Sequence, residues 1–290
     1  MFKQIDFEQS KLKDIRINSD YPMNKLRCFS GAWYHKVVTS RKKWLGIETV
    51  ITLPEFIPDE TRKENTILAG EEIMRFLDTP SVYLGSSSDY ENDIGFGFFH
   101  GKIDGELTKE KITFRPFWRN IYIENGKEVN TYRGSNIDDT EYYFFPGDKV
   151  KVSLICLKEE YLTFKISLLQ QTNIEPYASI RKKLQLPKDF CVENILAPGN
   201  GIRDTEYKIV NAIDQYHNEG KPTQMTRARA INCIFHNSYL FIEKEKELLK
   251  VPFFKQENQV LCCPDERGFL IKEDDEAKVV SIIPEKSVNL

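Results

Sequence analysis

The sequence lacks the long hydrophobic runs that would place it in a membrane. Within its 290 residues, no stretch reaches the roughly 18 consecutive apolar residues of a membrane-spanning helix. Its first segment, MFKQIDFEQSKLKDIRI, holds no apolar stretch of signal-peptide length. We therefore expect a soluble protein of the cytoplasm with no membrane partner.

The sequence also lacks the short motifs that identify common enzymes. Its 4 histidines are far apart, with no HExxH and no i,i+4 pair, so nothing local predicts a metal site. There is no Gly-x-Ser-x-Gly, no phosphate-binding loop and no dinucleotide fingerprint. We expect no cofactor and no bound metal.

Neither the net charge nor the cysteine content indicates a particular function. The 41 basic and 44 acidic residues nearly cancel, so no net field favours nucleic acid, and we expect no nucleic-acid partner. The 6 cysteines are scattered through a large chain, which favours free thiols in a reducing compartment. The adjacent Cys262 and Cys263 have no CxxC spacing and no nearby histidine, so we interpret them as ordinary thiols.

What the sequence does contain is period-two hydrophobicity. Residues 149–157 and 161–169 both alternate apolar with polar side chains, which predicts a hairpin with one buried face. Asn125-Gly126, between two short apolar runs, is a strong hairpin signal because both residues tolerate the positive φ of a type I′ turn. Many further short strands with turn residues between them, and little helical spacing, predict an all-β protein built as an antiparallel β-sandwich.

Other segments are assigned by weaker patterns. We predict hairpins for 32–38 with 45–53 and for 227–235 with 239–243, and closing strands at 269–271 and 279–283. Residues 59–76 are expected to be a surface insertion with a short helix, and residues 177–184 either a helix or an irregular return. Residues 1–29 form an arm or edge element in this interpretation, and residues 30–290 form the sandwich.

Several short segments resemble a known superfamily. They are LGIETVITLP from Leu45, SVYLG from Ser81, DIGFGF from Asp93, Phe117-Trp118, Pro146-Gly147-Asp148 and FCVE from Phe190. Their order is similar to that in the concanavalin A-like lectins and glucanases, which are jelly-roll sandwiches with one convex and one concave sheet. Within that superfamily, residues 44–213 look most like the glutamic peptidases. The resemblance implies a jelly roll with minor helical insertions.

The same resemblance implies a pair of site residues. Glu193 occupies the position of the family's catalytic glutamate, whereas Asp93 stands where the family has a catalytic glutamine. An ionised aspartate donates no hydrogen bond to a developing oxyanion and would repel its charge. If Glu193 and Asp93 face one another, they could instead act as a carboxylate pair in a hydrolase of the glycosidase or acid-peptidase type.

Aromatic and basic residues suggest a role without catalysis. Arg115 and Arg119 share one face of a predicted strand and Trp118 lies on the other, while Tyr143 belongs to a run of four aromatics. Such residues stack on sugar rings and pair with hydroxyls. We expect a lectin-like surface that binds a glycan, peptide or other extended polar ligand. The alternatives are the hydrolase above and a structural or partner-binding protein. The sequence leaves the oligomeric state open.

Overall fold

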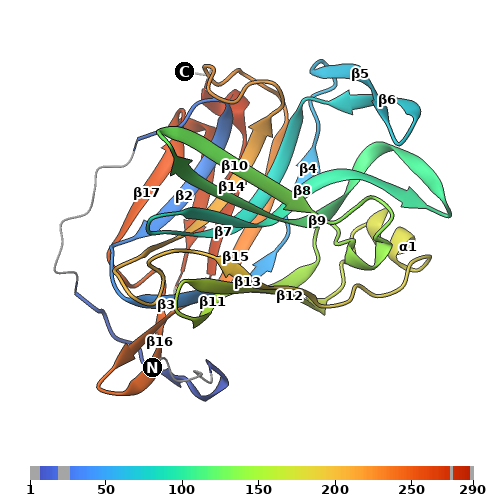
Figure 1. The fold of residues 1–290 in the computed structure, drawn as a ribbon. Coiled ribbons are helices and arrows are strands. Elements are labelled where there is room, and N and C mark those ends of the chain that lie inside the picture. Colours follow the sequence, from blue (N-terminus) through green and yellow to red (C-terminus); the bar gives the residue numbers. More distant parts are fainter. Residues whose placement is uncertain (1–6, 19–26, 275–276, 288–290) are drawn as a thin grey trace.

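The computed structural model describes residues 7–18, 27–274 and 277–287. It is an all-β sandwich of two sheets whose strands pair almost entirely antiparallel, as the alternating pattern predicted. Figure 1 shows the two layers, with β11, β12 and β13 below β7, β8 and β9 in that view. Among the described residues the only α-helix is the single turn α1 (Tyr177–Arg181), accompanied by the short 3₁₀ turns η1 (Phe7–Gln9), η2 (Thr140–Tyr142), η3 (Glu266–Gly268) and η4 (Pro284–Ser287).

Within the part of the chain that the structure describes, sheet I has ten strands and sheet II has seven. The main path of sheet I is β1 (Lys11–Leu12), β16 (Glu247–Pro252), β15 (Arg229–Lys244), β3 (Trp44–Thr52), β11 (Lys149–Lys158), β12 (Tyr161–Gln170) and β13 (Phe190–Leu196), with β4 (Glu55–Ile57), β19 (Ala277–Ile282) and β18 (Phe269–Glu273) paired beside it. The order in sheet II is β10 (Lys127–Gly134), β9 (Glu106–Glu124), β8 (Glu91–Ile103), β7 (Asp78–Ser87), β14 (Glu206–Gln215), β2 (Ala32–Thr39) and β17 (Asn258–Cys263).

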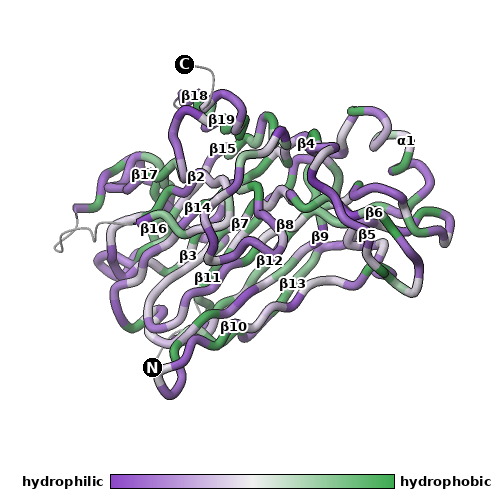
Figure 2. The backbone as a smooth tube through the Cα atoms, turned by 90° about the horizontal axis from the view of Figure 1, so that it is seen from above, coloured by the Kyte–Doolittle hydropathy of each residue, from purple (hydrophilic) through white to green (hydrophobic). Residues whose placement is uncertain are grey.

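The core lies between the sheets. Along each strand, alternate side chains point inward, so fully buried Ile47, Val152 and Phe164 of sheet I meet Leu84 and Phe96 of sheet II. Figure 2 shows that hydrophobic and hydrophilic residues are mixed along the strands of both layers. Burial of these apolar faces is the main force that holds the two layers together.

Some of the predicted hairpins form in the structure and others do not. β11 pairs with β12, and β9 with β10, as the sequence indicated. The prediction for 32–38 with 45–53 was wrong, because β2 lies in sheet II and β3 in sheet I. The basic turn between them therefore carries the chain from one layer to the other.

Three further expectations are corrected. Residues 227–243 form no hairpin, because β15 runs straight through Asn237, whose positive φ of 41° marks an irregularity in the pairing. The short helix expected within 59–76 is instead a two-stranded hairpin of β5 (Lys63–Leu68) and β6 (Glu71–Phe76). Cys263 is not a free thiol, because it forms a disulfide with Cys28.

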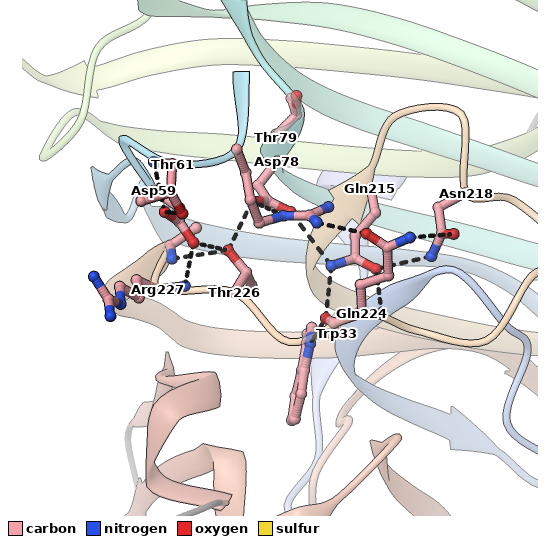
Figure 3. A network of polar contacts seen from close by, with 12 residues as sticks. Trp33, Asp59, Thr61, Asp78, Thr79, Gln215, Asn218, Gln224, Thr226 and Arg227 are labelled. Atoms are coloured by element: carbon pink, nitrogen blue, oxygen red, sulfur yellow. Dashed lines mark hydrogen bonds and ion pairs between the residues drawn. The ribbon is translucent and has the colours of Figure 1, made fainter. Parts of the chain in front are cut away.

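A buried polar network joins the loop before β15 to sheet II (Figure 3). The Asp78 carboxylate, which is 1% exposed, accepts hydrogen bonds from Arg62 Nε at 2.9 Å and Thr226 Oγ1 at 2.7 Å. It also accepts one from Gln215 Nε2 at 3.3 Å. Nearby Asp59 accepts the backbone N–H of Arg227 at 2.7 Å. The two carboxylates therefore fix the path of this loop, because moving it would leave buried charges unpaired.

Candidate functional site

The face of sheet II that points away from the core collects polar and aromatic residues. On β8, Ile94 and Phe96 point inward, so their neighbours Asp93, Gly95 and Gly97 point outward. The registers of the adjacent strands place further side chains on the same side. We call this surface the outer face of sheet II; it comprises Tyr83, Gly85, Glu91, Asp93, Gly95, Gly97, Arg115, Phe117, Arg119, Tyr132, Lys208 and Asp214.

An ion triad occupies one end of this face. Lys208 Nζ lies 2.5 Å from Asp93 Oδ1 and also contacts the Glu91 carboxylate. Gly85 pairs with both Asp93 and Lys208, so it separates them in the sheet. A Cβ at Gly85 would lie 2.6 Å from the Asn92 carbonyl oxygen and even closer to the Lys208 side chain. The absence of a side chain at Gly85 therefore allows the Lys208 side chain to reach the Asp93 carboxylate.

Lys208 and Glu91 of the triad keep their charges although Lys208 is largely buried. The side chains of Lys208 and Asp93 are only 6% and 8% exposed. Burial lowers the pKa of Lys208, but the charges and hydrogen bonds of Asp93 and Glu91 outweigh this effect and raise it above its usual value. The charge of Lys208 in turn lowers the pKa of Glu91 to about 2. Lys208 and Glu91 thus remain ionised at neutral pH.

Aromatic rings and a second ion pair lie beside the triad. The ring of Tyr132 stacks on Phe117 at 5.4 Å between centroids and 19° between planes, while Tyr132 itself is 53% exposed. Arg119 NH2 lies 3.7 Å from Glu219 Oε1, in the loop after β14. Gly95 and Gly97, between β7 and β9, add no side chains to this surface. A ligand at this surface would therefore meet the exposed Tyr132 ring and the Arg119 guanidinium, whereas Gly95 and Gly97 are buried and the Phe99 ring lies against Gly97.

A third carboxylate, Asp214, shares this face. Burial raises the pKa of Asp214, and the negative charge of Asp93 adds to this effect, whereas a hydrogen bond from Ser81 opposes it. Asp214 can therefore carry a proton at a pH where an ordinary aspartate cannot, while Asp93 has a lysine partner. Asp214 is thus the carboxylate of this surface that is protonated more readily than an ordinary aspartate.

The structure does not bring together all the residues that the sequence singled out. Glu193 lies on β13 of sheet I and is exposed, whereas Asp93 lies on the outer face of sheet II, on the far side of the core. Trp118 points the other way from its neighbours on β9 and packs against the core. The expected meeting of these three side chains therefore does not occur.

Tyr143 and the two arginines also separate. Tyr143 is fully buried, where its hydroxyl accepts the Lys102 N–H at 2.9 Å and donates to the Ile137 carbonyl, so it cannot reach a ligand. Arg115 and Arg119 do lie on the outer face, as their alternation predicted. The Arg115 guanidinium stacks 4.5 Å from the Phe99 ring centroid.

Sequence reasoning missed Lys208, Tyr132 and Asp214. Lys208 sits in an apolar strand, where a single lysine gives no local signal of an ion triad formed across three strands. The glycines at alternate positions 95 and 97 were the one available clue, because they mark a strand face without side chains.

Nothing in the described part of the chain indicates a resident metal or a membrane span. Residues 7–18, 27–274 and 277–287 contain no cluster of three or more His, Cys, Asp or Glu side chains suited to a metal ion. Within the same ranges no helix is long and apolar enough to cross a bilayer.

Comparisons with known proteins show similarity in structure only. No known protein family matches the sequence, and no curated protein matches it either. Among solved structures, Scytalido-glutamic peptidase with a peptide-based transition state analog is 10% identical, with a TM-score of 0.50 over 88% of this chain and 100% of the other. An eqolisin-family peptidase bound to the tripeptide Ala-Ile-His is 8% identical, with a TM-score of 0.43 over 88% of this chain and 100% of its own.

The beta-porphyranase of the human gut bacterium Bacteroides plebeius is 10% identical and has a TM-score of 0.22, covering 66% of this chain and 55% of its own. At these identities, the match to the glutamic peptidase supports the jelly-roll fold and carries no information about activity.

Proposed function

We propose that this protein binds an extended polar chain, a glycan or a peptide, on the outer face of sheet II and performs no chemistry on it. The observation that carries the proposal is the exposed Tyr132 ring, held flat on Phe117 beside the Arg119–Glu219 pair. A sugar ring or a planar peptide group can stack on such a ring, while the arginine donates hydrogen bonds to oxygen acceptors.

Two considerations decide between glycan and peptide as the first ligand to test. The stacked ring with neighbouring charged hydrogen-bonding groups favours a glycan. A peptide is the second candidate, because the similar Scytalido-glutamic peptidase was solved with a peptide-based analog. One panel of oligosaccharides and peptides of matched length tests both.

A hydrolase is the second candidate function. Asp93 and Asp214 share the outer face, and burial raises the pKa of Asp214, so this pair is better placed for acid–base chemistry than Glu193 with Asp93. The ion pair to Lys208 argues against a reactive Asp93, because it holds the carboxylate at 2.5 Å from a cation. For this reason binding without turnover is the preferred proposal.

The test compares variants of the two faces. We expect Arg119→Ala and Tyr132→Ala to weaken ligand binding by about tenfold, since each removes an interaction of about 1 kcal/mol or more. Glu193→Gln, on the exposed face of the other sheet, is the matched control and should bind like the wild type. Turnover of any panel member that Asp214→Asn abolishes would establish the hydrolase instead. Binding that survives both outer-face substitutions would overturn the proposal.

A further inference from the structure

A cavity lies on the opposite side of the molecule from the outer face of sheet II, on the outward face of sheet I. It has a volume of about 680 Å³ and is lined by residues of β3, β11, β12, β15 and β16, with the segment around η1 and β1 as a further wall. Known small-molecule sites occupy roughly 300–1,000 Å³. Three lysines line this cavity, Lys151, Lys165 and Lys250, and we call it the lysine pocket.

One carboxylate organises two of these lysines. Glu48 Oε1 lies 2.7 Å from Lys250 Nζ, and its Oε2 lies 2.8 Å from Lys151 Nζ. Burial raises the pKa of Glu48, but the hydrogen bonds from the two lysines outweigh this and lower it below its usual value. Glu48 thus stays ionised and holds both ammonium groups at the cavity wall. Each ammonium has three N–H donors and uses one on Glu48, so donors remain for a second anion.

The other walls combine aromatic rings with polar side chains, among them Glu8, Ser10 and Ser167. Phe241 lines the cavity, and Phe7 meets its ring edge-on at 5.1 Å between centroids. Lys250 Nζ lies 4.4 Å from the centroid of the Tyr239 ring, so this cation is fixed from one side by an aromatic face and from the other by Glu48. Ser153, on β11, adds a hydroxyl to the floor. A ligand would therefore place a charged end at the lysines and an apolar end against the rings.

We propose that the lysine pocket binds a small organic anion, with a carboxylate, sulfonate or phosphate group at Lys151 and Lys250 and an apolar or aromatic body against Phe241 and Phe7. The site is independent of the outer face of sheet II, because the core lies between them. Its ligand class differs as well, since the pocket has the size for a compact molecule.

The experiment uses the whole protein and 8-anilinonaphthalene-1-sulfonate, a fluorescent aromatic anion, as the probe. Lys151→Met removes one pocket cation and leaves Glu48 paired with Lys250, so the fold should persist. Lys149→Met is the matched control, because Lys149 lies two residues away on the same strand and does not line the cavity. We expect Lys151→Met to raise the dissociation constant about fivefold or more and Lys149→Met to leave it unchanged.

Two further arms separate the pocket from general adsorption of the dye. Benzoate should displace the probe, while benzamidine, a cation of similar shape, should not. Ser153→Leu fills the floor and should abolish saturable binding. Circular dichroism and thermal unfolding of each variant confirm that it is folded. Equal effects of Lys151→Met and Lys149→Met, equal displacement by the two competitors, or undiminished binding to folded Ser153→Leu would each overturn the proposal.

Discussion

Replacing Lys208 by methionine tests the ion triad most directly. Methionine keeps much of the buried stem of the lysine and removes the charge, so Asp93, with its side chain 8% exposed, becomes a buried carboxylate without its cation. Removing one partner of a buried pair costs roughly 3–5 kcal/mol. The fall of the Glu91 pKa from 4.5 to about 2 adds a smaller contribution. For a fully buried group, a pKa shift of this size would correspond to about 3 kcal/mol of folding stability. Because the Glu91 side chain is 39% exposed, solvent screening reduces this contribution to about 1 kcal/mol.

We therefore expect Lys208→Met to lower the free energy of unfolding by about 5 kcal/mol at pH 7, measured by urea denaturation. The stabilisation from Glu91 is present above pH 4.5, its usual pKa, and is lost as the pH falls through about 2. The difference in the free energy of unfolding between Lys208→Met and the wild type should therefore shrink on acidification. Adding Asp93→Asn to Lys208→Met should recover much of the loss. Lys109→Met, on an exposed position, is the control. A loss below about 1 kcal/mol, or no rescue by Asp93→Asn, would refute the reasoning.

Three other perturbations probe the same architecture. Gly85→Ala should destabilise the protein by about 2 kcal/mol, because its Cβ would press on the Asn92 carbonyl at 2.6 Å and on Lys208; urea denaturation measures this. Asp78→Asn should cost about 3 kcal/mol in the same assay, since an amide nitrogen cannot accept the hydrogen bond from Arg62; an equally stable variant would contradict the importance of the network. Reducing the disulfide should lower the melting temperature, because it frees a loop with a sequence separation of 235 residues and removes about 2–5 kcal/mol of stabilisation; an unchanged melting temperature would contradict this.

Where neighbouring strands along the chain also pair in space, local patterns predicted the structure correctly. The alternation in β11 and β12 defines both their buried face and their pairing, and Asn125-Gly126 defines the turn between β9 and β10. The same reasoning failed for β2 and β3, because a short turn between two strands looks alike in sequence whether they pair or enter different sheets. It failed for β15 because Asn237, a turn-forming residue, here marks an irregularity within a continuous strand.

The candidate site illustrates a second limit. Alternation correctly placed Arg115 and Arg119 on one face, because they belong to one strand. It could not show that Glu193 belongs to the other sheet, since sheet membership is decided by pairing between strands far apart in the sequence. The disulfide joins residues of equally distant segments and was missed for the same reason.

The sequence by itself determined that this chain is an all-β sandwich, because period-two burial is a property of each strand and needs no knowledge of its neighbours. Only the tertiary structure decided which charges meet: Lys208 with Asp93 across Gly85, and Glu48 with Lys151 and Lys250. The physical reason is that a charged side chain gains its partner from strands brought together by the buried core, and no residue near it in the sequence identifies that partner.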